Sequence, residues 1–120
     1  MTDHDTITKN YIAAWNETDG GHREKLLEAA FAADARFQDP IMQGQGRAEI
    51  GALMAGVQQQ YPGFRFALKG KPDGFADQLR FSWTLGPDGV EAPIEGTDIC
   101  IVEDGRLKSV TGFFDKVPAA

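Results

Sequence analysis

Two aspartates and a tyrosine are the residues of this chain best suited to acid–base chemistry. Asp39 precedes Pro40, and proline disfavours the helical conformation for the residue before it, so we expect Asp39 extended at a strand end. Such a carboxylate is either a turn cap or, where an apolar wall raises its pKa, a general base. Tyr11 lies in a helical pattern, where its hydroxyl either donates to an enolate oxygen or is paired within the core.

Asp98 is the second acid, and it sits in an otherwise apolar strand beside Ile99 and Cys100. A carboxylate in such surroundings needs a partner. Asp98 is therefore either the second acid of an active site or the partner of a basic side chain such as Arg80. Strand alternation places Asp98 and Thr97 on opposite faces. One residue of register slip decides which of the two points inward.

Composition limits the classes of function. The chain has 120 residues, of which 42% are hydrophobic, enough for one core, so residues 1–120 are expected to form a single domain. The net charge of −6 comes with scattered basic residues, which argues against a nucleic-acid or membrane partner. One cysteine permits no internal disulfide, and the start of the chain lacks the pattern of a signal peptide, so we expect a cytoplasmic protein.

Metal and cofactor motifs are not found. The chain contains no His-x-His, no Cys-x-x-Cys and no glycine-rich phosphate loop, so we expect no metal and no cofactor. Cys100 has no histidine near it in sequence, and we interpret it as a small buried residue and not as a nucleophile.

Hydrophobic periodicity divides the chain into a helical half and a strand half. Helical spacing predicts helices over 6–16, 23–32 and 46–61, and a period of two predicts strands over 36–39, 64–69, 78–85, 91–102 and 106–115. Helices followed by an antiparallel meander indicate an α+β fold with the helices on one face of the sheet. Both faces of the last strand mix apolar and polar residues, a pattern that a sheet with helices inside and a partner subunit outside would give, so we expect a homodimer.

Several segments in this order resemble a known superfamily. They are Tyr-Ile-Ala-Ala-Trp-Asn at 11–16 and the segments 31–40, 44–50, 103–107 and 112–115. They are similar to the nuclear-transport-factor-2-like superfamily, in particular its SnoaL-like and ketosteroid-isomerase-like members. The resemblance implies a cone-shaped, curved antiparallel sheet wrapped around three N-terminal helices and enclosing an apolar pocket. It does not fix an activity, because this superfamily includes isomerases, cyclases, epoxide hydrolases, dehydratases and proteins without catalysis.

The resemblance also assigns roles to residues. Ketosteroid isomerase uses a carboxylate base and an oxyanion hole made of a tyrosine and a protonated aspartic acid. By motif, the base corresponds to Asp39 and the tyrosine to Tyr11, while the aspartic acid falls on Thr97 without a gap or on Asp98 one place further along. The final-strand acids of limonene epoxide hydrolase and of the SnoaL-type cyclase align with Gly112, so neither chemistry transfers to this chain.

The predicted function follows from these positions. Six aromatic residues either line a pocket for a flat hydrophobic ligand or only fill the core: Trp15, Phe37, Phe66, Phe81, Trp83 and Phe114. We expect a small hydrophobic ligand and a cofactor-free, isomerase-like enzyme that shifts a proton alpha to a carbonyl of a steroid- or polyketide-like substrate. The alternative is a non-catalytic ligand-binding or accessory domain of the same fold. Convergence of Asp39 and Tyr11 on one cavity is the observation that separates the two.

Overall fold

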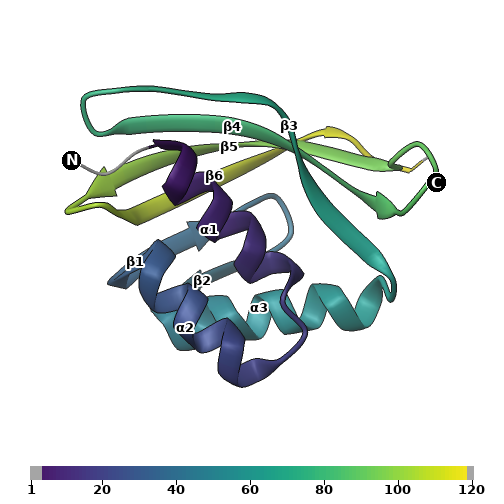
Figure 1. The fold of residues 1–120 in the computed structure, drawn as a ribbon, viewed down its shortest axis with the longest axis horizontal. Coiled ribbons are helices and arrows are strands. Elements are labelled where there is room, and N and C mark those ends of the chain that lie inside the picture. Colours follow the sequence, from purple (N-terminus) through teal and green to yellow (C-terminus); the bar gives the residue numbers. More distant parts are fainter. Residues whose placement is uncertain (1–3, 119–120) are drawn as a thin grey trace.

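Three helices pack against one face of a curved six-stranded sheet in a computed structural model that describes residues 4–118 (Figure 1). Residues 1–3, which belong to the segment used above to argue against a signal peptide, lie outside the described residues. The helices are α1 (His4–Asn16), α2 (Gly20–Ala30) and α3 (Arg47–Gln60). The strands are β1 (Phe31–Gln38), β2 (Gln43–Gln45), β3 (Phe64–Phe75), β4 (Gln78–Pro87), β5 (Ile94–Glu103) and β6 (Arg106–Lys116).

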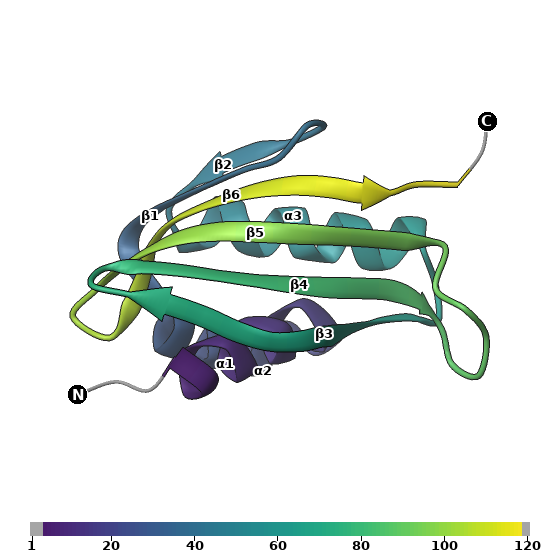
Figure 2. The same cartoon turned by 90° about the horizontal axis from the view of Figure 1, so that it is seen from above.

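The strand order across the sheet is β2-β1-β6-β5-β4-β3 (Figure 2). Strands β3 to β6 form the predicted antiparallel meander, and the α+β fold with a curved, open sheet is confirmed. The sheet is mixed and not wholly antiparallel, because β1 runs parallel to β6. Helix α3 and four strands separate β1 from β6 in sequence, so no hairpin turn constrains their relative direction.

The junction between α2 and β1 differs from the prediction. Helix α2 ends at Ala30 and not at residue 32, and β1 begins at Phe31 and not at residue 36. A register irregularity between Phe31 and Arg36 interrupts the strand alternation, so the buried residues Phe31 and Ala35 are spaced as in a helix. The short strand β2 was not predicted, because its three residues carry no apolar pattern.

Side-chain hydrogen bonds attach helix α1 to its neighbours. The Asn16 amide donates to the backbone oxygen of Phe66 at 2.9 Å and accepts from its N–H at 2.7 Å, which joins the end of α1 to β3. The Gln58 amide of α3 donates to the carbonyl of Trp15 at 2.8 Å. These contacts fix the buried face of α1, which carries Tyr11 and Trp15, against the inside of the sheet.

Across residues 4–118, none of the helices is both long and apolar enough to cross a bilayer.

Replacing Gly96 by alanine is expected to destabilise the sheet by about 1–3 kcal/mol, because the site has no room for a side chain. A Cβ atom at this position would lie 2.7 Å from Cε2 of Trp83 and 2.8 Å from the carbonyl oxygen of Phe113. Denaturant unfolding measures the change. The control is Gly56→Ala in α3, where a Cβ meets nothing within 4 Å and alanine favours the helix. Equal stability of Gly96→Ala and wild type would contradict the prediction.

Candidate active site

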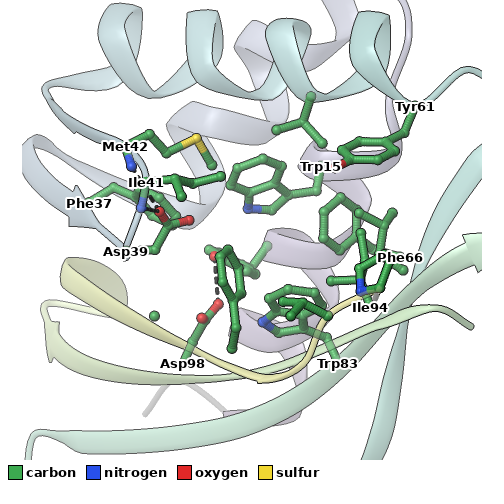
Figure 3. A pocket seen from close by; sticks show the side chains of 17 residues that line it. Trp15, Phe37, Asp39, Ile41, Met42, Tyr61, Phe66, Trp83, Ile94 and Asp98 are labelled. Atoms are coloured by element: carbon green, nitrogen blue, oxygen red, sulfur yellow. Dashed lines mark hydrogen bonds between the residues drawn. The ribbon is translucent and has the colours of Figure 1, made fainter. Parts of the chain in front are cut away.

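A cavity of about 310 Å³ lies between the concave face of the sheet and helices α1 and α3 (Figure 3). Five of the six predicted aromatic residues line it: Trp15, Phe37, Phe66, Trp83 and Phe114. Phe81 is not among the lining residues. Its ring packs behind Tyr11, with 5.1 Å between the ring centroids, so it supports the tyrosine without facing the cavity.

The predicted residues Tyr11 and Asp98 meet on the wall of this cavity. The Tyr11 hydroxyl donates to Oδ2 of Asp98 at 2.7 Å, and each residue is only 2% exposed. Asp98 therefore points inward. Thr97 points outward, where its hydroxyl donates to Oδ2 of Asp115. The alternative partner Arg80 pairs instead with Asp73 at 3.0 Å on the exposed side of the sheet.

The environment of Asp98 favours its neutral form. Burial raises the pKa of this carboxyl to about 6, with a smaller contribution from the nearby charge of Asp39, while hydrogen bonds from the Tyr11 and Trp83 side chains act in the opposite direction. Burial and the charge of Asp98 raise the pKa of Tyr11 well above its usual value. Near neutral pH the carboxyl therefore exists in both forms, whereas the phenol keeps its proton.

Asp39 caps a turn and also lines the cavity. Its Oδ1 accepts from the backbone N–H groups of Ile41 at 2.9 Å and Met42 at 3.0 Å, as a turn cap does. The same side chain also lines the cavity, and its Oδ2 has no hydrogen bond within residues 4–118. Burial outweighs the two backbone hydrogen bonds and raises the pKa of Asp39. One oxygen is thus held by the turn, and the other is available.

Gly112 brings the two carboxyl groups onto the same wall. It lies in β6, between β5, where Asp98 is its register partner, and β1, which leads into Asp39. A Cβ atom at Gly112 would stand 2.9 Å from Oδ1 of Asp98 and 3.2 Å from Cβ of Asp39. Figure 3 shows the two labelled aspartates at one side of the cavity and Phe66 and Ile94 at the other. A glycine inside a strand often marks a close approach of this kind, so the sequence did carry a signal for it.

The cavity also has parts that the sequence did not point to. Tyr61 from the end of α3 and the aliphatic residues Met42, Val57, Leu85 and Ile94 complete its wall. Among residues 4–118, no Lys, Arg or His belongs to the lining. In the part of the chain that the structure describes, no three His, Cys, Asp or Glu side chains are grouped so as to hold a metal ion.

Trp15 and Cys100 both lie close to Tyr11. Within residues 4–118, the indole N–H of Trp15 is the one buried side-chain donor without an acceptor. It stabilises the ionised form of the Tyr11 phenol, although by less than burial opposes it. Burial raises the pKa of the Cys100 thiol well above its usual value. The thiol therefore stays protonated, as expected for a structural cysteine.

Comparison with known proteins assigns the fold to a family. Residues 8–110 match the model of the SnoaL-like domain. The chain belongs to the SnoaL-like family. This SnoaL-like protein shares 42% identity and a TM-score of 0.89 with a proposed isomerase of the same family from Agrobacterium tumefaciens strain C58, over 96% of this chain and 99% of that one.

More distant structures share the fold alone. A proposed ketosteroid isomerase from Kribbella flavida DSM 17836 is 20% identical with a TM-score of 0.70, over 98% of this SnoaL-like protein and 81% of that chain. A proposed polyketide cyclase from Sinorhizobium meliloti is 17% identical with a TM-score of 0.71, over 89% and 93% of the two chains. No curated protein matches the sequence.

Proposed function

We propose that this SnoaL-like protein is a cofactor-free, isomerase-like enzyme that shifts a proton alpha to a carbonyl group of a small hydrophobic molecule. The observation that carries the proposal is the convergence of a free carboxylate oxygen of Asp39 and the Tyr11–Asp98 hydrogen bond on one apolar cavity. A carbon acid needs a base beside it and a hydrogen-bond donor for the oxygen that becomes an enolate.

The two carboxyl groups have different roles in this proton transfer. Oδ2 of Asp39 takes a proton from the carbon next to the carbonyl. The electron pair of that C–H bond forms a carbon–carbon double bond with the carbonyl carbon, and the π pair of the carbonyl moves onto its oxygen. Protonated Asp98, supported by Tyr11, donates a hydrogen bond to this oxygen. Asp39 then returns its proton to another carbon of the conjugated system, which completes the isomerisation. The apolar wall strengthens each of these electrostatic interactions.

The size of the cavity limits the substrate. At about 310 Å³ it lies at the lower end of the range of roughly 300–1,000 Å³ typical of small-molecule sites. A ligand of two or three fused rings, or one part of a steroid- or polyketide-like molecule, is the class that we propose.

Exchange of the α-protons of 1-tetralone in D₂O, followed by proton NMR, tests the proposed function. We expect exchange at least about 100-fold faster than in buffer. The rate should rise with pH as Asp39 ionises and fall above about pH 6 as Asp98 loses the proton that it donates. Binding of 1-tetralone without faster exchange would contradict catalysis.

That outcome would favour the second candidate function, a non-catalytic ligand-binding domain. The observation in its favour is the pair of backbone hydrogen bonds to Oδ1 of Asp39, because a turn cap alone explains them.

We propose that the protein forms a homodimer and that it is located in the cytoplasm. Phe113 and Ile99 leave 54% and 39% of their surface exposed on the outer face of β6 and β5, and exposed apolar side chains of neighbouring strands favour association. The buried, unpaired Cys100 is compatible with a reducing compartment. Sedimentation velocity measures the mass, and a monomer at micromolar concentration would contradict the dimer.

A further inference from the structure

We propose that the cavity also binds a small hydrophobic organic cation, such as a quaternary ammonium ion, with Asp98 ionised. The inference goes beyond the proposed function: it uses the same pocket, but it concerns a charged ligand and requires no turnover. Three features of the cavity support it, namely its charge, its aromatic wall and the arrangement of its acids.

The charged side chains that line the cavity are all acidic. Asp39 and Asp98 both belong to the lining, and in the described part of the chain no Lys, Arg or His does. Asp98 accepts a hydrogen bond from the neutral Tyr11 hydroxyl, and the neutral Trp83 side chain favours its ionised form. A buried carboxylate without a counter-ion is costly, and it is relieved either by a proton or by a cation. Above the pKa of Asp98, a bound cation is the species that can supply the missing positive charge.

The aromatic wall suits an organic cation and not a hydrated metal ion. The rings of Trp15, Phe66 and Trp83 form a continuous series, with centroid separations of 5.2 Å and 5.3 Å between neighbours. The series continues on one side to Phe37 and on the other to Phe114. Ammonium ions bind to the faces of such rings, and tryptophan is the most favourable of them.

The arrangement of the acids makes one compact negative site. Because Gly112 has no side chain, Oδ1 of Asp98 and Cβ of Asp39 approach the same point. The free Oδ2 of Asp39 lies on the same wall and belongs to a half-buried residue. The protein's net charge of −6 further favours the approach of a cation. Figure 3 shows the labelled Trp15 and Trp83 around the same cavity as the two aspartates, so one ligand can contact both kinds of group.

The titratable groups that face Asp98 come from three elements. They are Tyr11 of α1, Cys100 of β5 and Asp39 after β1. Tyr11 and Cys100 stay protonated and neutral, since burial raises both of their pKa values. Only the two aspartates therefore change charge between acid and neutral pH, and affinity for a cation should increase as they ionise.

A matched pair of probes tests the inference. Phenyltrimethylammonium and tert-butylbenzene have nearly the same shape, and only the first is charged. Quenching of tryptophan fluorescence reports binding, because both tryptophans of the chain line the cavity. At pH 7.5 we expect the cation to bind about tenfold more tightly than the hydrocarbon. The preference should fall at pH 4.5, where Asp98 is protonated, and in Asp98→Asn.

Asp34→Asn is the control, because Asp34 is an exposed acid that pairs with Lys108 away from the cavity. It should keep the full preference for the cation. Equal affinity for the two probes at pH 7.5, or no binding of either, would overturn the inference, as would a preference that is undiminished in Asp98→Asn. Exchange of 1-tetralone protons is measured separately. If the protein binds the cation but does not speed up this exchange, the proposed function is contradicted and this inference is not.

Discussion

Asp39→Asn is expected to slow the exchange of 1-tetralone α-protons by at least about 100-fold, because an amide cannot accept the proton that a carboxylate base removes. The substitution keeps the local structure. The Asn side-chain oxygen takes the place of Oδ1 and still accepts from the N–H groups of Ile41 and Met42. Affinity for 1-tetralone should therefore change by no more than about twofold. Proton NMR measures the exchange, and tryptophan fluorescence measures the affinity.

Asp34→Asn provides the matched control for this prediction. Asp34 and Asp39 both belong to the segment at β1, but Asp34 is exposed and bonded to Lys108, and loss of a surface ion pair has little effect on stability. Its exchange rate should equal that of wild type. If Asp39→Asn exchanges protons at the wild-type rate, Asp39 acts only as a turn cap and is not the general base.

Asp98→Asn is expected to remove a pH dependence of stability of about 3 kcal/mol. The pKa of Asp98 is about 6 in the folded protein against 3.8 for the unperturbed group, a difference of about two units at about 1.4 kcal/mol each. Between these values the folded protein binds more protons than the unfolded chain. The free energy of unfolding of wild type should therefore fall as pH rises from about 4 to 6. At higher pH, Asp98 is ionised in both the folded and the unfolded protein and causes no further change.

Urea unfolding of both proteins across pH 4–8 measures this effect. The difference between the two curves isolates Asp98, because the other carboxyl groups are common to both proteins. Asp39 has a raised pKa as well, so part of the decline should persist in Asp98→Asn. Parallel curves would show that Asp98 stays ionised in the fold, and the proposed oxyanion donor would lose its proton source.

Much of the candidate site could be read from the sequence. The helical spacing of Tyr11 and Trp15 placed both on the buried face of one helix, and Pro40 placed Asp39 at a strand end. The segments similar to SnoaL-like proteins were enough to predict the family, and the match over residues 8–110 confirms this prediction. These features depend on neighbours in the chain, and local patterns therefore predict them.

Other parts of the site depend on contacts between distant segments. The choice between Thr97 and Asp98 depended on the register of β5, and pairing with β4 and β6 decides it. The parallel pairing of β1 with β6 brings Asp39 beside Gly112. The glycine in the strand signals a close approach, but no local pattern shows which segment approaches it. Phe81 has the same alternation as the residues that line the cavity, yet Tyr11 covers it.

The sequence by itself therefore predicted the family, the helices and most strands, and it named Asp39 and Tyr11 as catalytic candidates, with either Thr97 or Asp98 as the third. Only the tertiary structure decided that Asp98 is the inward acid, that Tyr11 is its partner, and that Asp39 both caps a turn and faces the cavity. The physical reason is that helix and strand patterns arise from near neighbours, whereas a carboxyl group's partners and its pKa depend on segments that only the folded sheet brings together.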